Sequence, residues 1–230
     1  MSGIKIKDGI FGTDEENYSQ RVPCVVVMDC SYSMEGRPIE SLNKGLKQFE
    51  QELKADDKAR RSARVMLIRV GGFEGDAKEV SIRVPFQDVD SFFAPTEVAS
   101  GTTPLGEAVL LALSMIEEEK RHLRSQGHNY HRPWLFVMSD GEPSDTSTWE
   151  IACNEARKAS EAKKVSVFPI VVDGGSTDEL QKLTNRSVAK MDSIKFSEFF
   201  VWLSRSISGA SGEIAESPAM AKGYEGWTRA

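Results

Sequence analysis

Short apolar runs alternate with amphipathic stretches along most of the chain. Runs of this length, rich in β-branched residues and bounded by polar turns, are typical of strands. Those without internal alternation are typical of strands buried on both faces, and the first, second, fourth and fifth runs have this character. The pattern predicts strands at residues 22–29, 65–70, 80–86, 134–139, 165–172 and, more weakly, 187–191.

Apolar residues at three- and four-residue steps predict helices between these strands. Ser147 and Ser176 are each followed three residues later by glutamate, which predicts the starts of two further helices. Asp145 is expected to cap the first of these, and Pro104 makes Thr103 the expected N-cap of the helix that follows it. The three clearest helical stripes fall within residues 39–53, 105–116 and 196–207.

The second and third predicted strands are joined by Gly71–Asp76, which leaves no room for a helix and predicts a hairpin. The whole pattern therefore predicts an α/β fold class: a doubly wound, mostly parallel six-stranded sheet with one antiparallel edge strand and helices on both faces. We expect residues 21–208 to form a single domain. Weak periodicity and Gly- and Pro-rich composition predict an N-terminal extension at residues 1–20 and a flexible tail at residues 209–230.

Composition narrows the class of protein. The 230 residues are 40% hydrophobic, which is enough for one core, and carry a formal net charge of −6. This charge argues against a nucleic-acid partner, and the basic segment Lys58–Arg64 is expected to be a solvated connection. The apolar runs are far shorter than the roughly 20 residues of a membrane helix, and the start lacks a signal-peptide core. We expect a soluble, cytoplasmic protein with reduced cysteines and no membrane partner, and the oligomeric state stays open.

Candidate chemistry gathers at the predicted carboxyl ends of strands. The first strand ends in Asp29, and Ser31 and Ser33 follow at alternate positions, so the three side chains can turn towards one point. Asp140 ends the fourth strand, and Thr103 precedes a helix. Ligands of open α/β sheets bind at this edge, where the strand order reverses. Two carboxylates and three hydroxyls suit Mg²⁺, with Mn²⁺ next, because hard divalent cations prefer oxygen ligands.

The order of these motifs resembles the metal-ion-dependent adhesion site of von Willebrand factor A domains. The matching residues are Asp29-x-Ser31-x-Ser33, Thr103 within Gly-Thr-Thr-Pro-Leu-Gly, and Asp140 within Ser-Asp-Gly. The flanking residues are most similar to the TerY-like bacterial branch, which is associated with tellurite resistance and chemical stress. The resemblance implies that Asp29, Ser31 and Ser33 are the first-loop ligands, with the two hydroxyls contacting the metal directly. The same resemblance implies that Thr103 supplies the second loop and that Asp140 acts directly or through water. It also implies metal-dependent docking onto an Asp or Glu of another protein.

Two points within these motifs stay open. Thr102 is a rival for the threonine role, since either hydroxyl can reach the site. Tyr32 departs from the small residue usual at its position in the family. Its ring could narrow access to the metal, offer a contact surface to the partner, or pack sideways.

The sequence favours binding over catalysis. An aspartyl phosphatase would carry a second carboxylate two residues after Asp29, where Ser31 stands, and no histidine follows a predicted strand as a base. Phosphate-binding glycine loops are also missing. His122, His128 and His131 fall in a polar segment that is expected to be solvated. We therefore expect no enzyme; metal-assisted phosphoester chemistry is the runner-up, followed by a structural scaffold whose partner binding does not need the metal.

Overall fold

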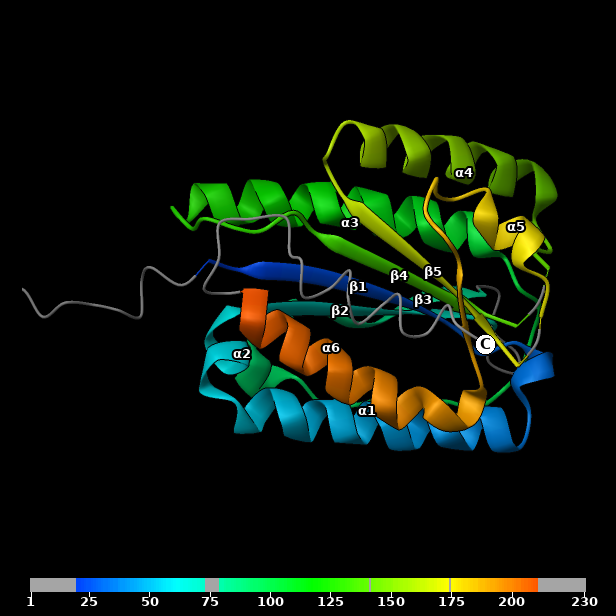
Figure 1. The fold of residues 1–230 in the computed structure, drawn as a ribbon, viewed down its shortest axis with the longest axis horizontal. Coiled ribbons are helices and arrows are strands. Elements are labelled where there is room, and N and C mark those ends of the chain that lie inside the picture. Colours follow the sequence, from blue (N-terminus) through cyan, green and yellow to red (C-terminus); the bar gives the residue numbers. More distant parts are fainter. Residues whose placement is uncertain (1–19, 73–78, 141, 174, 211–230) are drawn as a thin grey trace, which may run out of the picture.

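A six-stranded sheet forms the centre of the computed structural model, which describes residues 20–72, 79–140, 142–173 and 175–210 (Figure 1). The sheet order is β3-β2-β1-β4-β5-β6. Within the described residues, β2 and β3 pair antiparallel and the other neighbours pair parallel. This confirms the expected fold class. The strands are β1 (Val22–Asp29), β2 (Ala63–Val70), β3 (Val80–Gln87), β4 (Trp134–Ser139), β5 (Ser166–Val172) and β6 (Ala189–Met191).

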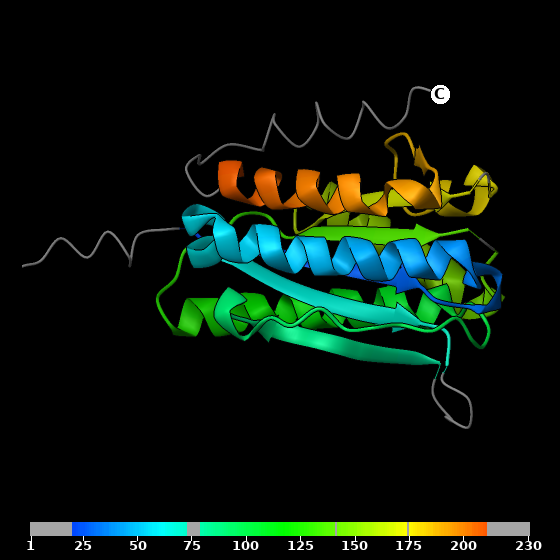
Figure 2. The same cartoon turned by 90° about the horizontal axis from the view of Figure 1, so that it is seen from below.

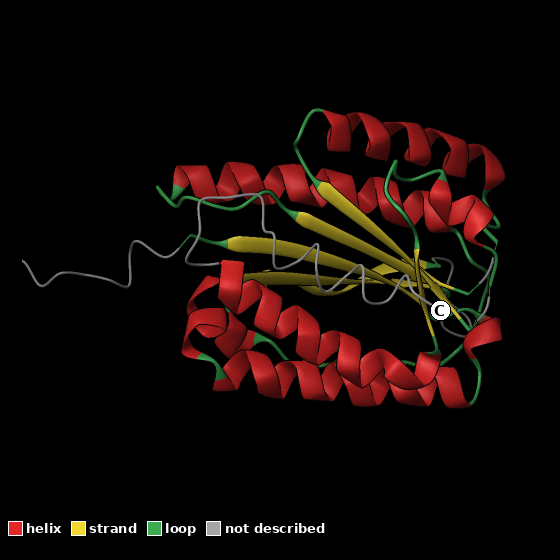
Figure 3. Cartoon of the chain, viewed as in Figure 1, coloured by secondary structure: helices red, strands yellow, loops and turns green. Residues whose placement is uncertain are grey.

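Helices cover both faces of this sheet (Figures 1 and 3). One face carries α1 (Arg37–Ala55), α2 (Asp57–Ser62) and α6 (Phe196–Ala210), and the other carries α3 (Leu105–Ser125), α4 (Thr146–Glu161) and α5 (Thr177–Gln181). Among the described residues there are also three short 3₁₀ turns: η2 (Tyr32–Met34), η3 (Val89–Ser91) and η4 (Ser193–Lys195). Among the described residues, no helix is both long and apolar enough to cross a membrane.

The central strands are buried on both faces, as the absence of alternation predicts. All eight residues of β1 are buried. Val26 and Met28 belong to the core cluster under α1 and α6, whereas Val25 and Val27 belong to the cluster under α3 and α4. Strand β3 mixes buried and exposed positions, as an edge strand does.

Helices α1 and α6 pack unusually close at Gly45. A Cβ atom added there would lie 2.9 Å from Cδ2 of Phe200 and 3.0 Å from the backbone carbon of Phe196. Aromatic rings fill the space beside this contact, with Phe49 and Phe200 at a centroid distance of 5.1 Å. The absence of a side chain at this position therefore sets how closely the two helices approach.

The chain enters β1 and leaves α6 at the end of the sheet where the parallel strands begin (Figures 1 and 2). The His131 amide donates to the carbonyl of Arg21 at 2.8 Å, and the His131 ring bonds to the backbone of Ala210. The expectation of a solvated histidine segment is therefore wrong at His131, which is 8% exposed, because the bridge between Arg21 and Tyr130 draws it against β1. His122 is exposed as expected.

Two predicted helix starts differ from the structure. Helix α3 begins at Leu105 with Pro104 as its N-cap, so Thr103 is not the cap. Helix α4 begins at Thr146, which places Ser147 inside the first turn rather than at a capping box. The cap at Ser176 is confirmed, because its hydroxyl accepts from the Asp178 amide at 3.2 Å.

The basic segment 58–64 is only partly the expected solvated connection. Residues 57–62 form α2, in which Arg60 is exposed and paired with Asp90. Arg64 is instead buried, and its Nε lies 2.8 Å from Oε1 of Glu119. The predictions for the N-terminal extension and the C-terminal tail lie almost entirely outside the described residues.

Candidate metal centre

Three loops meet at the carboxyl ends of the parallel strands. They follow β1, precede α3 and follow β4. The described chain enters and leaves at the opposite end of the sheet. Backbone hydrogen bonds join the first two loops: the Ser100 amide donates to the Cys30 carbonyl at 2.9 Å, and the Tyr32 amide to the Gly101 carbonyl at 3.3 Å. The Ser144 amide donates to the Thr103 carbonyl at 2.9 Å, which joins the second loop to the third. Since β1 and β4 are neighbours at the point where the order reverses, the loops lie where ligands of such sheets bind.

Asp29 is the last residue of β1 and is 2% exposed. Its Oδ1 accepts from the Ser31 amide at 2.9 Å and its Oδ2 from the Ser139 hydroxyl at 2.5 Å. Burial raises the pKa of Asp29; hydrogen bonds from Ser139 and Ser31 lower it in part, and the charge of Asp140 raises it further. The ionised carboxylate is therefore in an environment that disfavours its charge.

Hydroxyl groups link the two carboxylates. The 3₁₀ turn η2 carries Ser33 back over the sheet edge, where its Oγ donates to Oδ1 of Asp140 at 2.9 Å. The Ser31 and Ser33 hydroxyl oxygens lie 3.0 Å apart. Four of the five predicted ligands thus form one continuous polar chain, with Asp29 and Ser31 buried and Ser33 exposed. The exposed end leaves the chain of oxygens accessible to a molecule from solvent.

The two candidate threonines have different surroundings. The Thr102 hydroxyl donates to Oε2 of Glu79 at 2.5 Å and accepts from the Ser144 hydroxyl at 3.2 Å. The Thr102 amide also donates to Glu79, at 2.8 Å. Thr103 is 9% exposed, and its hydroxyl has no hydrogen-bond partner among the described residues. These contacts favour Thr103 as the residue whose hydroxyl is available for a ligand.

No counter-charge accompanies the carboxylates in the described part of the chain, where neither Asp29 nor Asp140 forms an ion pair with a lysine, arginine or histidine. The described residues also contain no group of three or more His, Cys, Asp or Glu side chains suited to a metal. A thiolate or imidazole centre is therefore a poor match, and the donor set is two carboxylates with neutral hydroxyls. Such a set fits a small hard cation that also keeps water or an external oxygen ligand.

Three side chains at this end of the sheet have roles that sequence reasoning did not assign. Ser139 is bonded to Asp29, and Glu79 holds Thr102. Asp145 was expected to cap α4, but its carboxylate accepts from the amides of Gly106 at 3.1 Å and Glu107 at 2.8 Å, so it caps α3 instead. Pro104 has no side-chain acceptor, which signals that α3 needs a cap from elsewhere, although the sequence does not say from where.

Cys30 and Tyr32, the two residues between the ligand positions of the first motif, differ in exposure. Tyr32 is 66% exposed, so its ring is not buried in the fold. Cys30 is fully buried, and burial raises the pKa of its thiol. The three cysteines are unpaired. An exposed aromatic ring therefore stands at the rim of the candidate site.

This chain belongs to the von Willebrand factor type A domain family, because the model of that family matches residues 24–200. Domains of this family often take part in protein–protein interaction or adhesion, and often bind a divalent metal. No curated protein matches the chain in sequence.

Solved structures share the fold at low sequence identity. The pilus adhesin SpaC from Lactobacillus rhamnosus GG, in its open conformation, has a TM-score of 0.64 at 15% identity over 84% of this chain and 31% of its own. The von Willebrand domain of the type V pili tip protein Mfa5 from Porphyromonas gingivalis has a TM-score of 0.59 at 11% identity over 86% of this chain and 99% of its own. Proximal thread matrix protein 1 from the mussel byssus has a TM-score of 0.52 at 11% identity, over 83% and 48%. The chain thus spans about a third of SpaC and half of the byssus protein.

Proposed function

We propose that this domain is a metal-dependent protein-interaction module. Asp29, Ser31, Ser33, Thr103 and Asp140 would hold Mg²⁺, or Mn²⁺ in its place, and a carboxylate from an Asp or Glu of a partner protein would complete the ligand shell. The metal, when bound, supplies a positive centre that a partner carboxylate can ligate. Binding rather than catalysis is the proposed role, without a nucleic-acid or membrane partner.

The observation that carries this proposal is that two neighbouring carboxylates, Asp29 and Asp140, have no positively charged partner among the described residues. Asp29 is buried beside a second carboxylate, and its pKa is raised because burial disfavours the ionised form. Ser33 bridges towards Asp140, yet hydroxyl groups supply no charge. A divalent cation would neutralise both carboxylates, and the neutral hydroxyls would leave it able to attract a further anion.

The biological setting is proposed on the resemblance of the flanking sequence. Residues around Asp29 and Asp140 are most similar to the TerY-like branch, so we propose a cytoplasmic role in bacterial stress response or tellurite resistance. The metal-dependent docking mechanism does not depend on this setting and can be tested separately.

Calorimetric titration with Mg²⁺ and Mn²⁺ tests the metal centre. Asp29→Ala should abolish measurable binding, since it removes the most buried carboxylate of the set. Asp90→Ala is the matched control, because Asp90 is exposed and pairs with Arg60 far from the loops. Equal metal binding by the wild type and Asp29→Ala, or no binding by either, would refute the assignment.

A pull-down from native extract, with Mg²⁺ or with chelator, tests the docking mechanism. A partner that is retained with Mg²⁺ and lost with chelator and with Asp29→Ala supports docking through the metal. A partner that stays bound under all conditions supports the structural scaffold instead. Turnover of a phosphoester that is lost with Asp29→Ala would replace the proposal with metal-assisted catalysis.

A further inference from the structure

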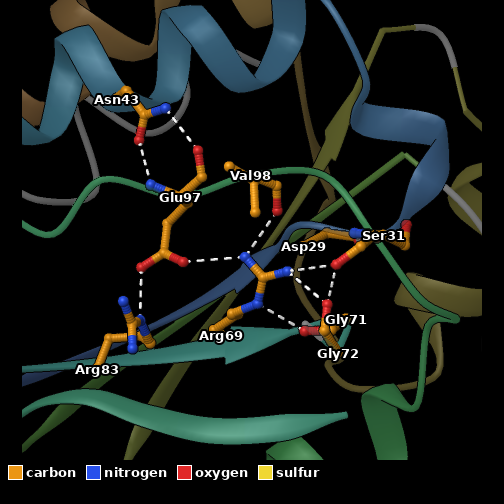
Figure 4. A network of polar contacts seen from close by, with 10 residues as sticks. Asp29, Ser31, Asn43, Arg69, Gly71, Gly72, Arg83, Glu97 and Val98 are labelled. Atoms are coloured by element: carbon orange, nitrogen blue, oxygen red, sulfur yellow. Dashed lines mark hydrogen bonds and ion pairs between the residues drawn. The ribbon is translucent and has the colours of Figure 1, made fainter. Parts of the chain in front are cut away.

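A fully buried arginine, Arg69, lies beside the segment of Glu97 and Val98 (Figure 4), which leads along the chain to Thr103. Arg69 belongs to β2 and is 0% exposed. Its guanidinium, which has five N–H donors, donates to at least five acceptors among the described residues. These are the carbonyls of Gly71 at 2.6 Å, Gly72 at 2.8 Å and Val98 at 2.8 Å, Oε2 of Glu97 at 2.9 Å and the Ser100 hydroxyl at 3.1 Å.

Glu97, which pairs with Arg69, is held by two further residues, one at its carboxylate and one at its backbone. Glu97 is 1% exposed, and its Oε1 accepts from Nε of Arg83 at 2.8 Å. Asn43 of α1 clasps the Glu97 backbone: the Glu97 amide donates to Asn43 Oδ1 at 2.7 Å, and Asn43 Nδ2 donates to the Glu97 carbonyl at 2.8 Å. Figure 4 shows this clasp on the side of Glu97 away from Arg69. Residues 97–100 are therefore tied both to the sheet and to α1.

These tied residues continue directly into the candidate metal centre. The Ser100 amide donates to the Cys30 carbonyl, which lies between Asp29 and Ser31 in the chain, and the Gly101 carbonyl accepts from Tyr32. Thr103 follows two residues later. Arg69 thus fixes the segment that both braces the first loop and presents the predicted ligand of the second.

Stability alone is a poor explanation for this arrangement. Taking a guanidinium and a carboxylate out of water costs several kcal/mol per ion, and apolar residues of similar volume often stabilise a protein as well or better. What an arginine adds is a planar set of five donors that holds several backbone carbonyls in one geometry. Three of the five acceptors of Arg69 are backbone carbonyls of the two loop segments that it joins.

We propose that Arg69 is a positioning residue of the metal centre: through Glu97, Val98 and Ser100 it sets where the Thr103 loop stands relative to Asp29. This inference rests on the proposed function, which it deepens by naming a residue that controls metal affinity without touching the metal. The proposal predicts that loss of Arg69 weakens metal binding, whereas loss of a comparable buried arginine far from the site lowers stability without weakening metal binding.

Arg64→Met is the matched control for Arg69→Met. Arg64 lies on the same strand, is also buried, and also pairs with a buried glutamate, but at the far end of β2 from the site. Each substitution removes an arginine from a buried carboxylate, although Glu97 keeps its contact with Arg83, so both should lower the unfolding midpoint. Arg69→Met should weaken Mn²⁺ binding at least tenfold in calorimetry, whereas Arg64→Met should stay within twofold of the wild type. Equal loss in both variants, or unchanged affinity in Arg69→Met, would overturn the proposal.

Amide hydrogen exchange of the metal-free protein provides a readout that does not depend on metal binding. In Arg69→Met the Ser100 amide should exchange at least tenfold faster than in Arg64→Met, because the segment that it belongs to is no longer held. If Arg69→Met does not fold, Asn43→Ala releases the Glu97 backbone without exposing a charge and should show the same two effects in smaller degree. If the wild type binds no Mn²⁺, the proposed function fails, while exchange still decides whether Arg69 positions the loop. If the Ser100 amide exchanges at the wild-type rate in both Arg69→Met and Asn43→Ala, the positioning role of Arg69 is refuted.

Discussion

At the scale of single residues, Asp29 of the proposed metal centre has a pKa that burial raises. Its folded-state pKa is raised, so the folded chain binds a proton more readily than the unfolded chain. Above the unfolded pKa, stability is therefore lost as pH rises through the folded pKa, and the metal-free fold bears this cost at pH 7. A carboxylate retained under such a penalty is typical of a binding residue.

Asp29→Asn should raise the stability of the metal-free protein, by about 1 kcal/mol. An amide can still accept from the Ser31 amide through its oxygen, and its NH₂ can donate to the Ser139 hydroxyl, but it carries no charge. Thermal unfolding at pH 7 with and without Mn²⁺ checks this. The wild type should be stabilised by the metal and the variant should not. A variant that is less stable than the wild type without metal would contradict the argument.

His131 predicts a loss of stability in mild acid. Burial lowers its pKa, although the bond to the Ala210 backbone opposes this, and its Nε2 is buried without a partner in the described structure. The unfolded chain therefore gains a proton near pH 6.5 that the folded chain resists, so this contribution is complete above that pH and declines below it. His131→Gln should flatten the fall in stability between pH 7 and pH 5, measured by urea unfolding. His122→Gln, at an exposed position, is the control substitution.

The loops that carry the predicted ligands could be placed from the sequence, because each follows a strand or precedes a helix whose position the apolar pattern shows. Glu79 and Arg69 were not readable, because their roles come from loops that approach only in the folded chain. A charged residue within the apolar run of β2 breaks the pattern, and such a break is a usable signal of a buried polar network.

At the scale of elements, the capping of α3 by Asp145 joins two loops of the candidate site. Asp145→Ala should lower stability by about 1 kcal/mol, since the first amides of α3 lose their acceptor. It should also weaken Mn²⁺ binding, because Thr103 stands directly before that helix. Chemical unfolding and calorimetry measure the two effects. Glu142→Ala, exposed in the same loop, should change stability little.

The close approach of α1 and α6 gives a second prediction at this scale. Gly45→Ala would place a methyl group 2.9 Å from Phe200, and overpacking of this kind costs about 1–3 kcal/mol, more than the roughly 1 kcal/mol gained in helix propensity. The variant should therefore unfold at lower urea concentration. Gly209→Ala in α6 meets nothing within 4 Å and should be neutral or stabilising. Equal effects in the two variants would exclude close packing as the cause.

Element positions were more predictable than element ends. The runs at residues 22–29 and 134–139 coincide with β1 and β4, because continuous burial produces a continuous apolar run. The helix start at Ser147 was wrong, because the serine-glutamate spacing recurs by chance inside helices and the neighbouring Asp145 serves another helix. Local sequence patterns therefore predict which segments are buried, whereas a helix cap can come from a segment that is distant in the sequence, as Asp145 does for α3.

At the scale of the whole molecule, the candidate site and the points where the described chain enters and leaves the fold lie at opposite ends of the central strands. Arg21 and Ala210 both lie against His131 at one end, and Asp29 lies at the other, with β1 running between them. Eight extended residues span roughly 26 Å. The points where the described chain enters β1 and leaves α6 therefore lie about one strand length from the oxygen-lined end of the sheet.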